Sequence, residues 1–376
     1  MGSNKYTTFI FLFFLFIPVI DSLLNLSKPM VIKESKENRA LVEKPEVDIN
    51  HLDNFPSKYE LYYNDHFMLR DMLIDIYSKN KANYFNVSPV PDKAIIGKEN
   101  WLFTMENELR TYDGTFRFSD SVLIQFKNEF LHRKGFLKQR NCSMYIYIIP
   151  SKLLVYPEYI GNKVRRSDKP TQGEQLTQYL KANTDISITY LLPCLLKMKN
   201  KNNPLLFLKT DTHWSDYGAY ISYKEIINDL ARSFPDLKPL NEAALASDDT
   251  ITCGGNIAAM MQMEKYFKEH KHRLKLLKPH SFEIEKQNYP APAGFPYPWD
   301  YEKQKNCDNK KLPKALIIHD SFTQIMMPFL SENFSHSTYL FDSWKYTSNE
   351  NIIEIEKPDV VIYIIHEPLL KQVFEN

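Results

Sequence analysis

Short apolar runs recur through most of the chain and alternate with longer stretches in which apolar residues follow a helical spacing. The runs are rich in β-branched and aromatic residues, and they cover 143–150, 204–209, 314–321 and 360–366. The clearest helical stretches are 119–140 and 215–234. Strands that are apolar on both faces and alternate with helices are typical of a mostly parallel sheet flanked by helices. The pattern therefore predicts an α/β domain over residues 94–376.

The first 26 residues follow a different pattern. Lys5 precedes the apolar run FIFLFFLFIPVI, residues 9–20. This run has the character of an export signal, although it is short for a bilayer crossing, which takes about 20 apolar residues. No small-x-small cleavage site follows it, so we expect a retained membrane anchor over residues 1–26 rather than a cleaved signal peptide. In either case the remaining chain is expected outside the cytoplasm.

Residues 27–93 connect the expected anchor to the expected α/β domain. Residues 27–54 are polar and highly charged with little periodicity, which is typical of a tether. Residues 55–85 place Tyr, Phe, Leu and Ile at helical spacing. This spacing predicts one or two amphipathic helices, whose apolar face we expect to pack against the domain that follows.

Composition supports a folded globular protein and excludes some functions. Hydrophobic residues make up 43% of the chain, charged residues 25%, and the formal net charge is only +1. A chain so close to neutral gives no electrostatic reason to expect a nucleic-acid partner. The four cysteines are widely spaced without a Cys-x-x-Cys pair, so a zinc ribbon is excluded, while disulfides and buried free thiols both remain open.

Asp211 and His213 stand just past the predicted strand 204–209. Residues i and i+2 of an extended segment point to the same side, so the carboxylate and the ring can converge. A carboxylate that accepts the Nδ1 hydrogen of a histidine fixes its tautomer and stabilises the imidazolium that forms when the ring takes a proton. Ser215 is then the expected N-cap of the next helix. The alternative is an aspartate and a histidine that only cap a helix start.

Ser321 offers a nucleophile for this base. The apolar strand KALIIHDS, residues 314–321, runs directly into a helical pattern. A serine at such a turn places its hydroxyl at the carboxyl edge of the sheet, with its own N–H near a helix N-terminus that can hold an oxyanion. An N-cap serine is the alternative for this stretch taken alone, but together with Asp211 and His213 it predicts a Ser-His-Asp triad.

Gly254, Gly255 and Asn256 precede a short apolar helical pattern. Their N–H groups and the Asn256 amide are candidates for further oxyanion donors, and a plain glycine turn is the alternative. Several aromatic residues near the motifs are candidates for a stacking platform, although most are expected in the core: Trp214, Tyr217, Tyr220 and Trp299.

Together these stretches resemble the SGNH-hydrolase-like proteins of bacterial exopolysaccharide O-acetylation, of the alginate O-acetyltransferase type. The similar pieces, in chain order, are ENRALVEKPEV (37–47), YELYYNDHFMLRDMLIDIYS (59–78), IIGKENWLF (95–103), IPSKLLVYPEYI (149–160), DTHWSDYGAY (211–220), GGNIAAMM (254–261), HDSF (319–322) and KPDVVIYIIHEPLL (357–370). In that family the Asp-x-His motif precedes the nucleophilic serine, the reverse of the usual SGNH order.

The resemblance implies an SGNH-like fold with permuted motif order, in which Ser321 is the nucleophile, His213 the general base and Asp211 its orienter. It also implies an exported, membrane-anchored enzyme that moves acetyl groups onto polysaccharide hydroxyls. For such a substrate, the aromatic candidates named above would stack against pyranose rings. No bound cofactor is implied, because a membrane-bound O-acyltransferase partner supplies acetyl groups drawn from acetyl-CoA. The chain departs from the family pattern at His319, where glycine is usual, and at Gly255-Asn256, where an acidic residue is often found.

Other functions remain open at this point. A hydrolytic metal site is one, because several possible ligands lie near predicted strand ends: Asp211, His213, His319, Asp320, His366 and Glu367. No His-x-x-x-His spacing supports it, so we expect no metal. A polysaccharide O-acetylesterase with the same triad is a second alternative, and a non-catalytic polysaccharide-binding or scaffold protein is a third.

Overall fold

The structure is a computed structural model that describes residues 3–24, 42–47, 53–67, 70–85, 87–343 and 345–373. Its central sheet has seven strands in the order β4-β3-β11-β9-β10-β8-β7. Their bounds are β3 (Ser143–Ile149), β4 (Ser187–Tyr190), β7 (Ser281–Ile284), β8 (Glu302–Cys307), β9 (Lys314–His319), β10 (His336–Phe341) and β11 (Val360–His366). Neighbours from β4 to β10 pair in parallel, while β8 pairs antiparallel with β10 and with β7. The expected α/β fold with a mostly parallel sheet is confirmed.

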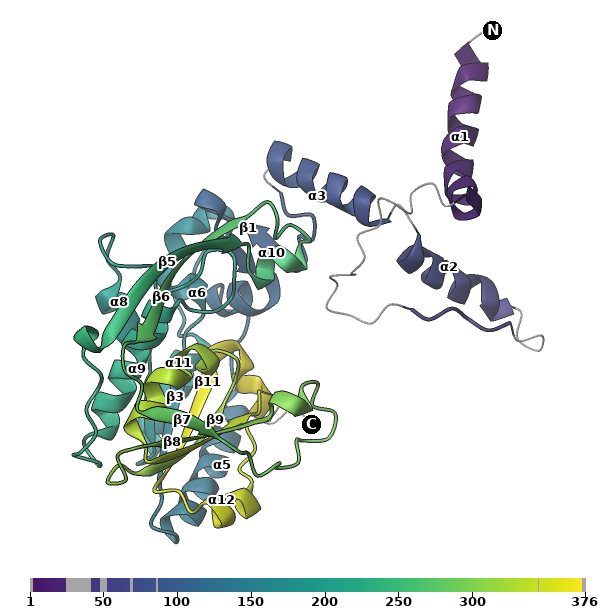
Figure 1. Cartoon of the computed structure of the whole chain (residues 1–376). Helices are drawn as coiled ribbons and strands as arrows, with labels where there is room; N and C mark the ends of the chain where they lie inside the picture. The colour runs from purple at the N-terminus through teal and green to yellow at the C-terminus, as the bar shows by residue number, and fades with distance from the viewer. Residues whose placement is uncertain are drawn as a thin grey trace.

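Helices cover both faces of this sheet, because successive side chains of each strand point to opposite sides. On one face, alternate residues of β3, β9 and β11 pack with α9 (Asp216–Leu230), α11 (Thr323–Leu330), α6 (Lys152–Val155) and α8 (Leu192–Met198). On the other face, the intervening residues pack with α5 (Asp120–Lys138), α7 (Gln172–Asn183) and α12 (Glu350–Glu356). Figure 1 shows these layers in the lower part of the molecule.

A smaller unit lies beside the sheet. It contains the hairpin β1 (Ala94–Ile96) and β2 (Leu102–Thr104), the short helices α4 (Arg110–Tyr112) and α10 (Asn256–Met260), and a long hairpin of β5 (Leu245–Cys253) and β6 (Lys268–Leu276). A third apolar cluster joins Ile96, Leu102, Ile257 and Phe267 across these elements. The unit therefore holds α10 next to the β1–β2 hairpin.

The predicted strands are confirmed at three places and wrong at one. Residues 143–149, 314–319 and 360–366 form β3, β9 and β11. The segment 204–209 is instead a buried loop, in which Phe207 makes an isolated antiparallel bridge to Trp214. Its apolar side chains pack into the core without joining the sheet. Hydrophobic patterning therefore identified a buried segment there but not its conformation.

The N-terminal region consists of α1 (Ser3–Leu24), α2 (Phe55–His66) and α3 (Arg70–Phe85), and Figure 1 shows α1 and α2 standing apart from the α/β domain. The prediction that the aromatic helices bury an apolar face against that domain is wrong for α2, of which no described residue is buried. Among the described residues, no helix combines the length and the apolarity that a bilayer crossing requires. The membrane anchor and the boundaries at residues 26 and 93 stay predictions.

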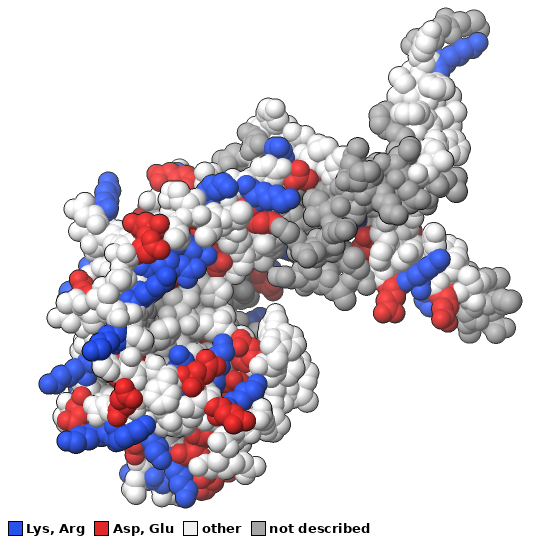
Figure 2. Space-filling view, in the orientation of Figure 1, with Lys and Arg blue, Asp and Glu red and all other residues white. Residues whose placement is uncertain are grey.

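The surface charge is mixed, and the cysteines are unpaired. Figure 2 shows acidic and basic side chains intermixed over the face in view, without a large patch of one sign. All four cysteines are free thiols. Burial raises the pKa of Cys142 and of Cys194 to about 12, so both stay protonated at neutral pH. Buried thiols of this kind behave as small apolar side chains.

Candidate active site

The turn after β9 carries Ser321 at the carboxyl edge of the sheet. Asp320 fixes this turn from inside, because its buried carboxylate accepts hydrogen bonds from the N–H of Phe322 (3.0 Å), the N–H of His366 (2.6 Å) and the hydroxyl of Tyr346 (2.8 Å). α11 then begins at Thr323. Ser321 thus stands on a turn that is tied to the end of β11 as well as to its own helix.

His213 lies between Ser321 and Asp211. Its Nε2 is 2.8 Å from Ser321 Oγ, and its Nδ1 is 2.7 Å from Asp211 Oδ1. The same carboxylate oxygen accepts the backbone N–H of His213 at 3.0 Å. With the Nδ1 hydrogen donated to Asp211, Nε2 is free to accept the hydroxyl hydrogen of Ser321. The structure therefore brings together the three residues that the sequence pointed to.

Asp211 stays ionised in this position. Burial by itself raises the pKa of Asp211, but hydrogen bonds from the ring and N–H of His213 and from the N–H of Asn256 outweigh it and lower that pKa to about 2. A carboxylate is therefore present throughout the working pH range. It can stabilise the imidazolium that forms when His213 takes a proton.

Gly255 and Asn256 hold the Asp211 loop and Gly254 holds the segment after α10, which corrects the prediction that the three residues bind an oxyanion. Their N–H groups are donated to Glu264 O (2.8 Å), Thr210 Oγ1 (2.8 Å) and Asp211 Oδ2 (2.9 Å), respectively. The Asn256 side chain accepts from the Thr212 N–H at 2.9 Å and donates to Thr212 Oγ1 at 2.7 Å. Each of the three N–H groups is thus already engaged, and the Asn256 N–H could turn to a reacting oxygen only by releasing Asp211.

The N–H of Ser321 is the better oxyanion donor. Among the described residues, no protein acceptor takes this N–H. It precedes α11, so the partial positive charge of a helix N-terminus adds to its field. The expected donation from the serine's own backbone thus agrees with the geometry.

Lys152 donates a hydrogen bond to the backbone of the Asp211 loop. Its side chain is fully buried, and its Nζ donates to the backbone carbonyls of Asp211 (2.7 Å) and Leu102 (2.5 Å). Burial lowers the pKa of Lys152, and the nearby carboxylates of Glu108 and Asp211 oppose that change. The ammonium group therefore joins the Asp211 loop to β2.

Glu269 on β6 holds the two residues that precede Asp211. Its buried carboxylate accepts the N–H of Lys209 at 3.0 Å and the N–H of Thr210 at 2.7 Å. Sequence reasoning missed both Lys152 and Glu269. A lysine within the apolar stretch IPSKLLVYP was a usable signal, because a charged residue there must be buried with partners. Glu269 lies in a charged stretch, EHKH, and gave no such signal.

Trp214 and Tyr220 are core residues, which corrects the prediction that they contact sugar. Both are buried, and they donate hydrogen bonds to the carbonyls of Phe322 (2.9 Å) and Leu240 (2.8 Å). Tyr217 packs partly buried against the same core. Trp299, by contrast, is 71% exposed. Among the four aromatic candidates, Trp299 presents the most accessible ring.

Of the other histidines and acids at the strand ends, His319, Asp320 and Glu367 have hydrogen-bond partners outside the triad, while the buried Nε2 of His366 has none among the described residues. Burial lowers the pKa of His319 to about 4 and that of His366 to about 3, so both rings are neutral at working pH. His319 Nδ1 contacts the carbonyl of Asp320, and Glu367 accepts from Gly173 N–H and the Tyr190 hydroxyl. Within the described part of the chain, no three such side chains are grouped to hold a metal ion.

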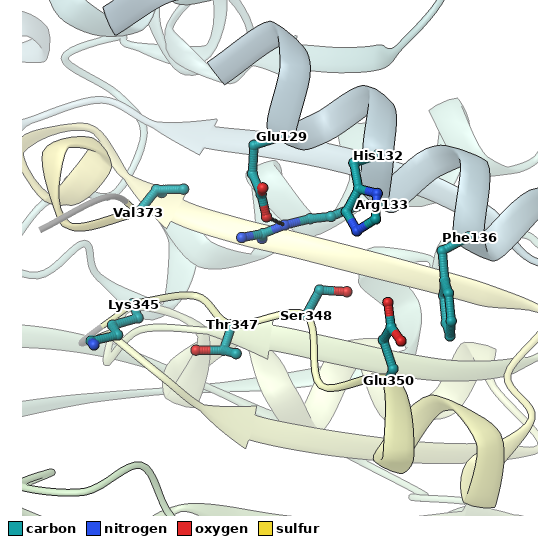
Figure 3. A pocket seen from close by; sticks show the side chains of 9 residues that line it. All are labelled: Glu129, His132, Arg133, Phe136, Lys345, Thr347, Ser348, Glu350 and Val373. Atoms are coloured by element: carbon teal, nitrogen blue, oxygen red, sulfur yellow. Dashed lines mark hydrogen bonds and ion pairs between the residues drawn. The ribbon is translucent and has the colours of Figure 1, made fainter. Parts of the chain in front are cut away.

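A separate cavity of about 250 Å³ lies under α5 and next to residues 345–350. Figure 3 shows its Glu129–Arg133 ion pair, which joins Arg133 Nε and Glu129 Oε1 at 2.7 Å. Arg133 also donates to the carbonyl of Tyr346, whose hydroxyl holds Asp320. Arg133, which lines the cavity, thus contacts the segment that holds the Ser321 turn.

The chain is similar to known proteins over much of its length. The family model described as "SGNH hydrolase-like domain, acetyltransferase AlgX" matches residues 94–298, more than half of the chain. This range contains Asp211 and His213, while Ser321 lies beyond it.

Relatives and solved structures are more distant. A probable alginate O-acetylase AlgJ of Pseudomonas syringae pv. tomato is 23% identical over 236 residues, 62% of this chain and 56% of the relative. The Pseudomonas aeruginosa AlgJ is 27% identical over 164 residues, 43% of this chain and 38% of the relative. The chain thus spans about half the length of the curated relatives it matches, or less. The structure of Bacillus cereus PatB1 with a sulfonyl adduct shares the fold, with a TM-score of 0.52, 16% identity, and coverage of 71% of this chain and 94% of that chain.

Proposed function

Because the chain belongs to the family of SGNH hydrolase-like acetyltransferase domains typified by AlgX, we propose that it is a polysaccharide O-acetyltransferase that works through an acetyl-serine intermediate. One observation carries the proposal: the continuous hydrogen-bond chain from Ser321 through His213 to Asp211, with contacts of 2.8 and 2.7 Å. Such a chain activates a serine hydroxyl that is otherwise too weak a nucleophile at neutral pH.

The first half of the reaction loads the acetyl group. His213 Nε2 takes the proton of Ser321 as Oγ bonds to the acetyl carbonyl carbon, and the oxygen of that carbonyl becomes negative. The N–H of Ser321 stabilises this oxyanion, and Asp211 stabilises the imidazolium. The bond from carbon to the donor's leaving group then breaks, the leaving group takes the proton from Nε2, and an acetyl ester remains on Ser321.

The second half delivers the acetyl group. His213 Nε2 takes the proton of a sugar hydroxyl, whose oxygen attacks the acetyl ester. When the tetrahedral intermediate collapses, the proton returns from Nε2 to Ser321 Oγ, and the sugar carries the acetyl group. Water in place of the sugar gives hydrolysis by the same route, which is the esterase alternative.

The setting of the reaction belongs to the proposal as well. We place the enzyme outside the cytoplasm, held to the membrane by residues 1–26, with acetyl groups supplied from acetyl-CoA through a membrane-bound O-acyltransferase partner. The apolar run at 9–20 supports the location. The curated relatives are named as probable alginate O-acetylases, so an acidic polysaccharide is the first acceptor to test.

Intact-protein mass spectrometry of the full chain after brief exposure to p-nitrophenyl acetate tests the proposal. We expect one acetyl adduct, mapped to Ser321 and absent from Ser321→Ala. Ser348→Ala, which alters the cavity under α5, serves as the control and should acetylate like the wild type. A wild-type protein that gains no adduct and turns over no ester would reject the enzyme and support the binding or scaffold alternative. An adduct that is lost only to water, even with oligosaccharide present, would support the esterase.

A further inference from the structure

The loop between β7 and β8 reaches the same edge of the sheet as Ser321. β10 and β9 run parallel with Phe341 opposite His319, so both strands end beside the turn that carries Ser321. β8 runs antiparallel to β10 with Glu302 opposite Leu340, so β8 begins at that edge. The residues just before Glu302, which form the short helix η8 (Pro298–Asp300), therefore lie two strands away from β9 at the reactive edge. In Figure 1 this loop passes beside the C-terminal label.

A hydrogen bond ties this loop to the nucleophile's own helix. Gln324 Nε2 donates to Asp300 Oδ2 at 2.9 Å, and Gln324 lies in the first turn of α11, three residues after Ser321. Lys303 pairs with the other oxygen of Asp300 at 2.8 Å. Trp299 is thus the immediate neighbour of a residue anchored to the helix that follows Ser321.

The loop presents two aromatic rings to solvent. Trp299 is 71% exposed and Tyr297 is 50% exposed, and their rings meet edge to face with centroids 6.0 Å apart. Trp101 and Trp214, the other tryptophans in the described part of the chain, are fully buried. A large ring that stays exposed does not contribute the favourable free energy of burial to folding. Exposed apolar side chains that cluster often mark surfaces that bind a ligand or a partner.

The backbone that carries the rings is restricted, and the Tyr297 ring is packed. Proline occupies positions 290, 292, 296 and 298, which restricts the backbone on either side of Tyr297. Phe295 is buried against Phe341 and Tyr301, and Tyr297 stacks on Phe341 with centroids 6.2 Å apart and planes 10° from parallel. Little conformational entropy is therefore lost from this part of the loop when a ligand binds to it.

We propose that Tyr297 and Trp299 form the acceptor subsite, where a pyranose ring of the polysaccharide stacks while the neighbouring sugar presents its hydroxyl to Ser321. This inference rests on the proposed function. It names the residues that would bind the sugar acceptor and so favour transfer of the acetyl group over hydrolysis. One face of a pyranose carries C–H bonds of slight positive charge, which suit the negative face of an indole or phenol ring. The rim hydroxyls of the sugar remain in contact with water and with the polar groups of the loop.

Kinetics of the full chain with an oligomannuronate acceptor test the subsite. Trp299→Ala should raise the KM for the acceptor about tenfold and leave its kcat nearly unchanged, because stacking acts before and during the transfer alike. Acetylation of Ser321 and its hydrolysis by water should stay at wild-type rates, since neither involves a sugar. Trp299→Phe, which keeps a flat ring, should restore most of the affinity. Tyr84→Ala removes a ring that is 80% exposed on α3 and is the matched control without effect.

A second readout separates failure of the subsite from failure of the proposed function. Titration of Ser321→Ala with the same oligosaccharide should change tryptophan fluorescence, and the change should vanish when Trp299→Ala is added. An acceptor KM unaltered by Trp299→Ala, in an enzyme that still acetylates, would overturn the subsite alone. A wild-type dimer that Trp299→Ala converts to a monomer in sedimentation would assign the rings to a contact between copies instead.

Discussion

The ammonium group of Lys152 anchors the backbone of the Asp211 loop. It is fully buried, yet it contacts backbone carbonyls of β2 and of the loop, and it lies near the buried carboxylate of Glu108. A buried charge is tolerated only when its partners are in place. We therefore expect stability and catalysis to depend on the same side chain.

Lys152→Met keeps the length of the side chain and removes the charge. We expect the free energy of unfolding to fall by roughly 3–5 kcal/mol, because Glu108 is left as an uncompensated buried group. The rate of Ser321 acetylation in the remaining folded protein should also fall, since Asp211 loses an anchor. Urea unfolding and the acetylation burst measure the two effects. Lys224→Met, at a weak and half-exposed ion pair with Glu242, is the control and should change stability by about 0.5 kcal/mol or less. Wild-type stability in Lys152→Met would contradict this account.

Asp211→Asn tests the charge behind His213. The amide is neutral and favours the wrong tautomer of the imidazole, so we expect acetylation of Ser321 to slow by about 10⁴-fold. Stopped-flow release of p-nitrophenol measures the rate. The chain offers a matched control, because Asp249 Oδ1 also contacts a histidine, His272, at 2.8 Å on the exposed β5–β6 hairpin. Asp249→Asn should react like the wild type, and equal losses in both variants would point to a general charge effect.

At the scale of elements, the close approach of α10 to the Asp211 loop controls the geometry. A Cβ built on Gly255 would lie 2.5 Å from Asp211 Oδ2, closer than any real contact. The backbone of Gly255 is extended (φ −79°), so space and not backbone strain requires glycine here. The Gly254–Gly255 segment, for which the sequence left a plain glycine turn as the alternative, therefore packs directly against the carboxylate of Asp211.

Gly255→Ala is expected to displace Asp211 and to lower the rate of Ser321 acetylation by about 10²-fold, because small misplacements of catalytic groups are costly. Gly135→Ala supplies the comparison, since a Cβ at Gly135 in α5 meets nothing within 4 Å. That variant should keep full activity and gain about 0.5–1 kcal/mol of stability from its higher helix propensity. If Gly255→Ala were equally active, α10 would have no part in positioning Asp211.

At the scale of the whole molecule, the sheet buries two histidines in neutral form. Burial lowers the pKa of His319 to about 4 and that of His366 to about 3, below the value of about 6.5 expected in the unfolded chain. Between these values the unfolded chain binds protons that the folded chain does not. Stability from these groups is therefore complete above about pH 6.5 and is lost as the pH falls toward 4.

Urea unfolding between pH 7 and pH 4 should show this loss. We expect His319 alone to account for roughly 3 kcal/mol of it. His319 packs against Tyr339 and Phe341, so a phenyl ring suits its site. His319→Phe should therefore flatten the dependence on pH. An unchanged slope in that variant would show that His319 does not titrate on unfolding.

The sequence by itself determined what depends on local pattern. Apolar runs rich in β-branched residues identified β3, β9 and β11, and alternation with helices identified a mostly parallel sheet. The order of motifs pointed to Asp211, His213 and Ser321, because a catalytic turn needs particular residue types at particular strand ends. Their roles as orienter, base and nucleophile stay predictions until the acetyl adduct is measured.

Only the tertiary structure decided where individual polar and aromatic groups point. Trp214 and Tyr220 face the core, and residues 204–209 remain a loop. The N–H groups of Gly255 and Asn256 hold Thr210 and Asp211 rather than an oxyanion. The physical reason is distance along the chain. A hydrogen bond such as that from Asn256 to Asp211 spans 45 positions, so it depends on how two segments pack. Hydrophobic periodicity records which residues are buried, but it carries no information on which distant group each one meets.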